Sequence, residues 1–168
     1  TGLGYPGGPL MDQAAVGGRI DAFSLPRTHF DNSLDFSFSG LKTAALNQLN
    51  QLKQQADREG LSWHEILSLQ DFAATYQHAI VDVLVQHTMK AAEELQIKRV
   101  VMAGGVSANS ALRELMKKEA DRRGLVLSFP PLILCTDNAA MIASAGYYRW
   151  KIGEKSSLDL NASASLDL

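Results

Sequence analysis

Apolar residues recur every three to four positions along two long stretches of the chain, which is the spacing of an amphipathic helix. In the first stretch, from Phe38 to about Gln55, these positions are Leu41, Ala45, Leu46, Leu49 and Leu52. In the second, from Trp63 to about Leu95, they are Ile66, Leu69, Phe72, Tyr76, Ile80, Val83, His87, Ala91 and Leu95. Gly60 is suited to ending the first helix, and Ser62 is suited to capping the second. We therefore expect two consecutive helices, each with one buried face.

A different pattern follows the second helix. The apolar run from Val100 to Ala103 leads into Gly104-Gly105, and a helix-forming stretch begins at Ser107. This order predicts a buried strand, a tight turn and a helix N-terminus. The complete set of expected elements is a strand at 98–103, a helix at 107–123, a strand at 125–129, and a helix from 136 or 137 to about 150. The expected buried face of the helix at 107–123 is Leu112, Leu115, Met116 and Ala120, and Gly124 is suited to ending it.

The two ends of the chain have weaker patterns. Residues 1–35 are rich in loop-forming residues, with one short apolar stretch at 10–16. From Leu158 onward, apolar and polar residues alternate strictly, which is typical of a half-buried strand but also fits a disordered low-complexity end. We divide the chain into a loop-rich start, 1–35, and one α/β domain, 36–168, with a partly parallel sheet and flanking helices.

Composition narrows the classes of protein. A chain of 168 residues is long enough for one core and too short for two domains. The net charge of −2 gives no global sign of nucleic-acid binding, so any RNA contact requires a local basic patch. The single cysteine, Cys135, excludes an internal disulfide and fits a reducing cytoplasm. No signal peptide and no apolar run of about 20 residues is present, so we expect no membrane association.

The glycine turn is the first candidate for chemistry. Gly104 and Gly105 allow a sharp turn and the close approach of a ligand. With Ser107 as N-cap, the free N–H groups after it favour an anion or a nucleotide. Many strand-to-helix turns carry glycines and bind nothing, so geometry leaves both interpretations open. Asn109 either lies on the helix surface or contacts a ribose or base over the diglycine.

Four ordered segments carry a resemblance to a known family. They are YPGGP at 5–9, DFSFSGLKTA at 35–44, AGGVSAN at 103–109 and CTDNAAMIA at 135–143. Together they resemble the tRNA adenosine threonylcarbamoyltransferase family, whose members were long described as O-sialoglycoprotein endopeptidases. The resemblance implies the actin-like, Hsp70-like ATPase (ASKHA) fold, with nucleotide between two α/β lobes. This chain would be the C-terminal lobe, and residues 1–35 would come from the region between the lobes.

The resemblance also implies roles for individual residues. Gly104, Gly105 and Asn109 would seat an adenine nucleotide, together with Gly8 of YPGGP. Asp12, four residues further on, is a candidate for the ribose hydroxyls or an ordinary acid at the start of a helix.

Asp137 has two compatible interpretations. Its position favours a helix N-cap, whereas a carboxylate beside phosphates also suits a divalent ion. The resemblance implies the second role, for one divalent metal ion (iron or zinc) that is also held by two histidines one helical turn apart in the N-terminal lobe. Here no two histidines are three or four residues apart; they are His29, His64, His78 and His87. We therefore expect no complete metal site within this chain.

The implied activity is transfer of a threonylcarbamoyl group from threonylcarbamoyl-AMP to N6 of adenosine 37 of tRNA. Implied partners are an inactive paralogue and a small ATPase, in the cytoplasm. The chain alone is expected to be inactive and to form a homodimer or a larger species through an open apolar surface. Alternatives are a non-catalytic nucleotide-binding or dimerisation module of ASKHA type and a sugar-kinase-like phosphotransferase. A serine protease is not favoured, because neither Ser37 nor Ser39 lies in a GxSxG motif.

Basic residues are concentrated between positions 98 and 123. They are either a solvated surface or contacts to tRNA phosphates. The set comprises Lys98, Arg99, Arg113, Lys117, Lys118, Arg122 and Arg123.

Overall fold

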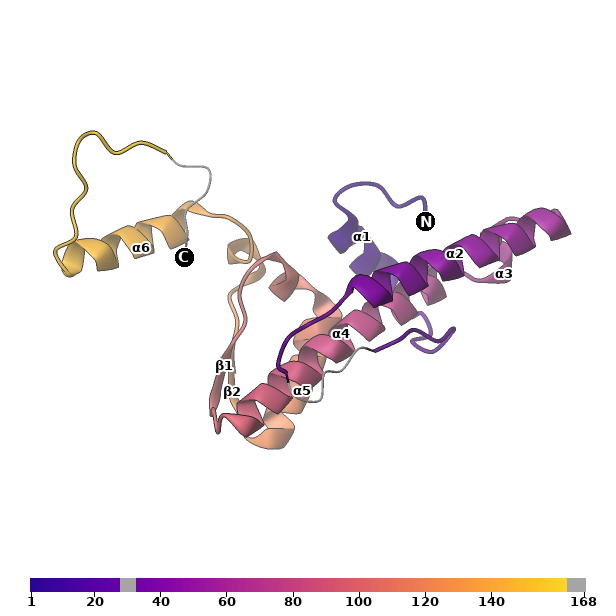
Figure 1. Ribbon diagram of the computed structural model, residues 1–168, viewed down its shortest axis with the longest axis horizontal. Helices are drawn as coiled ribbons and strands as arrows, with labels where there is room; N and C mark the ends of the chain where they lie inside the picture. The colour runs from indigo at the N-terminus through magenta and orange to yellow at the C-terminus, as the bar shows by residue number, and fades with distance from the viewer. Residues whose placement is uncertain (28–32, 163–168) are drawn as a thin grey trace.

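The computed structural model describes residues 1–27 and 33–162. Its elements, in order, are α1 (Gly7–Ala14), α2 (Ser39–Glu59), α3 (Trp63–Ile66), α4 (Leu69–Glu94), β1 (Arg99–Val101), the 3-10 helix η1 (Gly105–Ala108), α5 (Ser110–Arg123), β2 (Val126–Ser128), the 3-10 helix η2 (Leu132–Leu134) and α6 (Ala139–Lys151). Helix α4 is central, and α1, α2 and α5 pack against it (Figure 1). The α/β class is confirmed, with helices as the larger part.

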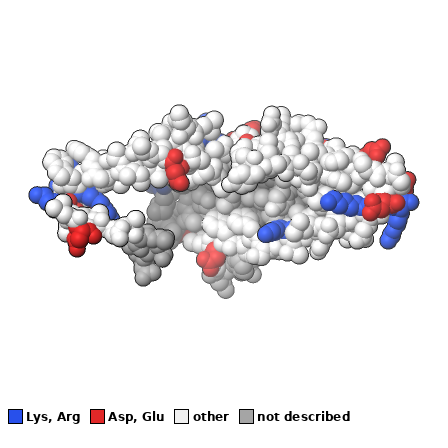
Figure 2. All heavy atoms as spheres, turned by 90° about the horizontal axis from the view of Figure 1, so that it is seen from above, with Lys and Arg blue, Asp and Glu red and all other residues white. Residues whose placement is uncertain are grey.

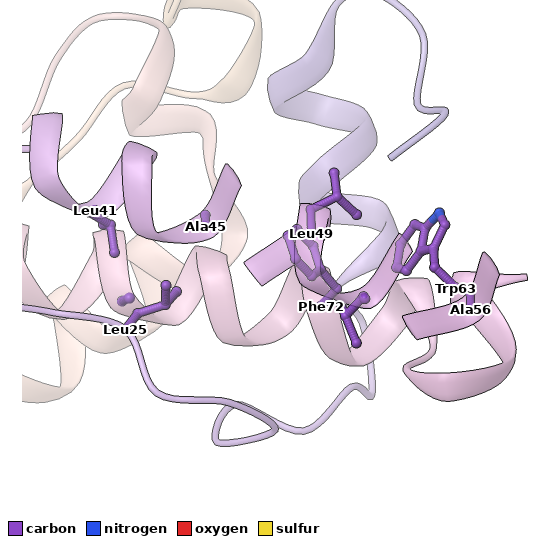
Figure 3. Packing of buried hydrophobic residues seen from close by; sticks show 9 residues of the cluster. Leu25, Leu41, Ala45, Leu49, Ala56, Trp63 and Phe72 are labelled. Carbon is purple, nitrogen blue, oxygen red and sulfur yellow. The ribbon is translucent and has the colours of Figure 1, made fainter. Parts of the chain in front are cut away.

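The largest apolar cluster lies between α2 and α4. Leu41, Ala45 and Leu49 of α2 are buried in the same cluster as Phe72 of α4, as Figure 3 shows. Burial of each leucine of this kind contributes about 1.5–3 kcal/mol relative to exposure. The predicted stripe of α2 is confirmed except at Leu46, which is exposed. Gly60 ends α2 in the left-handed conformation, with φ 68°, as expected.

The second predicted helix is interrupted. Ser62 begins only the short α3, where its N–H donates to Glu65 Oε2 at 2.7 Å. Leu67 is extended, and Ser68 then caps α4, its Oγ accepting the N–H of Asp71 at 3.0 Å. The prediction of one continuous helix from Trp63 was therefore wrong. A serine hydroxyl competes with helical backbone bonds, so Ser68 begins a new helix although the apolar spacing continues.

The two strands form a parallel pair in which Val100 is opposite Leu127, with α5 as the connection between them. Leu127 packs onto the cluster formed by α4 and α5. The neighbouring Val101 and Val126 are exposed by 75% and 54%. The partly parallel sheet is confirmed, but both strands are shorter than predicted. Within the part of the chain that the structure describes, helices cover one face of this sheet.

Other boundaries differ from the sequence prediction. Residues 1–35 are not only loop, because α1 lies within them and packs on Ala73 and Ala74 of α4. The tail predicted as a strand has none at 158–162, and 163–168 lie outside the described residues. Across the two described ranges, no helix is both long and apolar enough to cross a membrane.

Helix α6 stands apart from the helices around α4 (Figure 1). Every residue in it is exposed, including Ile142 and Trp150. It begins at Ala139 with Asn138 as N-cap, and not at Thr136 or Asp137 as predicted.

Candidate nucleotide site

The diglycine turn after β1 has the backbone that only glycine adopts easily. Gly104 has φ 82° and ψ 171°, a region that is strained for residues with a Cβ. The buried Ser107 donates its hydroxyl to the Gly104 carbonyl at 2.7 Å and so closes the turn onto η1. The prediction of Ser107 as the cap of α5 was therefore wrong.

Asn109 is the cap of α5, since its Oδ1 accepts the N–H of Leu112 at 2.9 Å. Asp12 of α1 caps the same helix from outside: its Oδ2 accepts the N–H of Ser110 at 3.0 Å. The Asn109 amide donates to Asp12 Oδ1 at 3.2 Å and to Gln77 Oε1 at 2.9 Å. Three helices thus meet at one hydrogen-bonded cluster.

This cluster changes the expectation for the helix N-terminus. The N–H groups of Ser110 and Leu112 already donate hydrogen bonds to side chains of the protein, so they are not available to bind an anion. Asp12 is neither free nor at the start of its own helix. Gln77 was missed by sequence analysis, because it stands beside the apolar stripe of α4 with no motif to mark it.

A cavity of about 890 Å³ opens where the two parallel strands end. Gly104, Gly105 and the segment 134–138 all line it. A Cβ placed on Gly105 would lie 4.0 Å from Thr136 Cγ2, so two of the sequence motifs face each other directly. Ligands of α/β proteins bind in such crevices beyond the carboxyl ends of strands.

Asp137 lines this cavity and is exposed. The neighbouring Asn138 caps α6, its Oδ1 accepting the Met141 N–H at 3.0 Å, so the interpretation of Asp137 as a cap was wrong. Within residues 1–27 and 33–162, the Asp137 carboxylate has no hydrogen bond or ion pair. Its carboxylate therefore makes no structural contact within these described residues.

The described residues do not form a metal site by themselves. Among them no three histidine, cysteine, aspartate or glutamate side chains are grouped closely enough to hold an ion. His64 lies on the Trp63 ring at 3.8 Å between centroids, and His87 lies 5.2 Å from the Phe36 ring. His29 falls outside the described residues. One carboxylate is too few ligands to capture a divalent ion tightly.

A second cavity, of about 380 Å³, lies on the other side of the segment 104–109. Gly8, Gln77 and Asn109 line it together with Tyr76, whose phenol pKa is raised by burial. The predicted binding residues are thus divided. Gly104, Gly105 and Asp137 line the larger cavity, Gly8 and Asn109 line the smaller one, and Asp12 is hydrogen-bonded to Asn109.

The basic residues between positions 98 and 123 do not form one continuous surface of unpaired cations. Arg123 and Arg122 both bind Glu119, and their hydrogen bonds hold the pKa of this carboxyl below its ordinary value. Lys117 pairs with Asp121 at 2.7 Å. Arg113 turns inward and binds backbone carbonyls. In Figure 2, charged side chains are sparse along the middle of the face seen, and we find no broad cationic patch there.

Comparison with known proteins decides the family. Residues 1–144 match the family described as tRNA N6-adenosine threonylcarbamoyltransferase. The chain belongs to this family. That span contains the four segments on which the resemblance rested, so the resemblance is confirmed. The roles of individual residues stay predictions.

Three relatives show how much of this chain, and how much of each relative, is covered by the similarity. A tRNA N6-adenosine threonylcarbamoyltransferase of Symbiobacterium thermophilum is 48% identical over 168 residues, covering 100% of this chain and 47% of the relative. Proteins with the same description from Desulfitobacterium hafniense (strain Y51) and Clostridium botulinum (strain 657 / Type Ba4) are 46% and 45% identical, each over 99% of this chain and 47% of the relative. The chain spans about half the length of these curated relatives.

Proposed function

We propose that this chain is the part of a tRNA threonylcarbamoyltransferase that seats the adenylate end of threonylcarbamoyl-AMP. In this proposal it is the C-terminal lobe of an ASKHA fold. The observation that carries the proposal is the larger cavity: the diglycine turn and the segment that contains Asp137 come from separate sequence motifs, and both line it. The cavity lies beyond the carboxyl ends of the two parallel strands, which is where ligands of α/β proteins bind, and this position supports a shared ligand for the two motifs.

The reaction forms one C–N bond, breaks one C–O bond and releases one proton from the amine. The N6 amine of adenosine 37 of tRNA attacks the carbamoyl carbon, the bond from that carbon to the phosphate oxygen breaks, and AMP leaves with the electron pair while the amine loses a proton. The chain's own contribution is orientation, because a correctly held adenylate makes the attack effectively intramolecular. Gly104 and Gly105 let the nucleotide approach the backbone. Asn109 and Gly8 line the smaller cavity, where Asn109 is hydrogen-bonded to Asp12. Asp137 supplies a carboxylate that lines the larger cavity.

The rest of the catalytic apparatus lies outside this chain in our proposal. An N-terminal lobe would supply the other side of the cleft and the remaining ligands of any metal ion. An inactive paralogue and a small ATPase would complete the modification complex in the cytoplasm. This chain alone would be inactive.

The nucleotide site is tested by Gly105→Val in the full-length protein. The added Cβ has room, with Thr136 Cγ2 at 4.0 Å, so the side chain fills the cavity without preventing folding. Isothermal titration with AMP should show affinity weakened by about tenfold or more. The matched control is Gly146→Val on α6, where a Cβ also meets nothing within 4 Å. It should leave AMP affinity unchanged.

Two results would contradict this placement. Equal AMP affinity of the wild type and Gly105→Val, with both folded, would exclude the larger cavity. Tight AMP binding without any threonylcarbamoyl transfer to tRNA by the full-length protein would favour the non-catalytic nucleotide-binding module instead.

A further inference from the structure

Arg113 holds together the segments that form the larger cavity. It lies on α5, and its Nε donates to the Ser107 carbonyl at 2.5 Å. Its Nη2 donates to the Pro130 carbonyl at 2.7 Å and lies 3.0 Å from Cys135 Sγ. The guanidinium also stacks over the Phe129 ring, 4.5 Å from its centroid. One side chain therefore contacts η1, the end of β2 and the segment before Asp137.

These contacts join the two sides of the site. Ser107 closes the glycine turn through its bond to the Gly104 carbonyl, and Cys135 is two residues before Asp137. A planar guanidinium with donors in fixed directions sets the spacing of its acceptors more strictly than an ammonium group can. Bonds from a charged donor are also stronger than neutral ones. Arg113 is thus placed to determine how far apart the turn and the Asp137 segment lie.

An ordinary surface role does not explain this arrangement. Arg122 and Arg123 on the same helix pair with the Glu119 carboxylate. Arg113 has no carboxylate partner in the part of the chain that the structure describes, and its donors face backbone oxygens and a buried thiol. Arg113 is partly buried, and its contacts with Pro130 and Cys135 reach 17 and 22 residues along the chain, so they do more than fix its own helix.

We propose that Arg113 is a positioning residue that fixes the glycine turn relative to the Asp137 segment and thereby sets the affinity of the larger cavity for its nucleotide. The proposal rests on the function proposed above. It removes Arg113 from the set of residues available for contact with tRNA phosphates.

The first test uses Cys135 as a reporter. It is the single cysteine of the chain, is 3% exposed and lies against Arg113. Arg113→Met keeps a long side chain but removes the donors; Arg122→Met changes the same residue type on the same helix without touching the cavity. Labelling with 5,5′-dithiobis(2-nitrobenzoic acid) is followed for the wild type and both variants at the same pH, of about 9. Arg113→Met should label at least about tenfold faster than wild type and Arg122→Met.

The second test measures nucleotide binding by the full-length protein. AMP should bind to Arg113→Met about tenfold more weakly than to the wild type. Arg113→Lys should have intermediate affinity, because a lysine keeps the positive charge but lacks the fixed directions of the guanidinium donors. A merely structural role would lower the melting temperature without changing AMP affinity at a temperature where all variants are folded.

The outcomes separate this proposal from the proposed function. Labelling of Arg113→Met at the rate of the wild type would overturn the role of Arg113. Unchanged AMP affinity of Arg113→Met, while Gly105→Val binds AMP weakly, would also overturn that role. In both cases the proposed nucleotide site would still stand. Unchanged affinity in both variants would overturn the nucleotide site, and this proposal with it.

Discussion

At the scale of single residues, Asp71 joins the segment after α1 to the start of α4. Its Oδ1 accepts the backbone N–H of Arg19 at 2.8 Å, and its Oδ2 accepts from the Arg19 guanidinium at 3.0 Å. The backbone hydrogen bond from Arg19, followed by the guanidinium bonds, lowers the pKa of this carboxyl below its ordinary value. A carboxyl with a lowered pKa in the folded state stabilises the fold above its unfolded pKa, and this contribution disappears as pH falls through the folded pKa.

We therefore expect Asp71→Asn to reduce the acid sensitivity of the fold. Between about pH 5 and pH 3, the melting temperature of the wild type should fall more steeply than that of Asp71→Asn. Melting temperatures measured by circular dichroism across this range check the difference. Asp57→Asn is the control, since Asp57 is an exposed acid on α2. Parallel curves for wild type and Asp71→Asn would exclude a contribution from the Arg19 pair.

Residue roles were predictable where they depend on local backbone. The sequence indicated a turn at Gly104-Gly105, and Gly104 does have the positive φ that favours glycine. The cap of α5 was misplaced because Ser107 and Asn109 are both good cap residues. The choice between them depends on Asp12 and Gln77, which are distant in sequence and bind Asn109 only in the folded chain. No local pattern contains that information.

At the scale of elements, the break between α3 and α4 is set by the Ser68 cap. Ser68→Ala removes the acceptor for the Asp71 N–H, a bond of 3.0 Å. We expect the free energy of unfolding to fall by about 1 kcal/mol, the usual cost of losing a serine N-cap. Urea titration measures this loss, with Ser156→Ala at an exposed position as control. A gain of helical circular dichroism without loss of stability would instead mean that α3 and α4 fuse in the variant.

Long helices with a repeated apolar face were predictable, and short elements were not. The stripes of α2 and α5 follow from apolar spacing, apart from the exposed Leu46, and the ends of these helices follow from the glycines at 60 and 124. The bounds of helix α1 were not predicted, because it begins within Gly-Gly-Pro and has eight residues. Its stability comes from Met11 and Ala15 packing on α4, a tertiary contact that helix propensity does not describe.

At the scale of the whole molecule, the described chain has one well-covered side and one open side. Parallel sheets are usually covered on both faces, yet Val101 and Val126 are exposed here. Further exposed apolar residues lie on η2 and α6 beside the larger cavity. We call the set the open apolar surface: Val101, Val126, Leu132, Ile133, Met141 and Ile142. A surface of this kind normally contacts other protein, and the curated relatives are about twice as long as this chain.

The 168-residue chain by itself should therefore associate in solution. Exposed apolar side chains gain about 25 cal/mol for each Å² removed from water, which favours a dimer or a larger species. Size-exclusion chromatography with light scattering measures the mass. Ile133→Asp, at a residue that is 81% exposed on the open apolar surface, should shift the chain toward monomer.

The control is Leu61→Asp, at an exposed apolar residue between α2 and α3 and outside that surface; it should leave the mass unchanged. If the wild-type chain is a monomer at all concentrations, or if Leu61→Asp disperses it as well as Ile133→Asp does, the open apolar surface does not drive association. If the surface does drive it, Ile133→Asp is also the variant in which AMP binding by the isolated chain can be measured without interference from self-association.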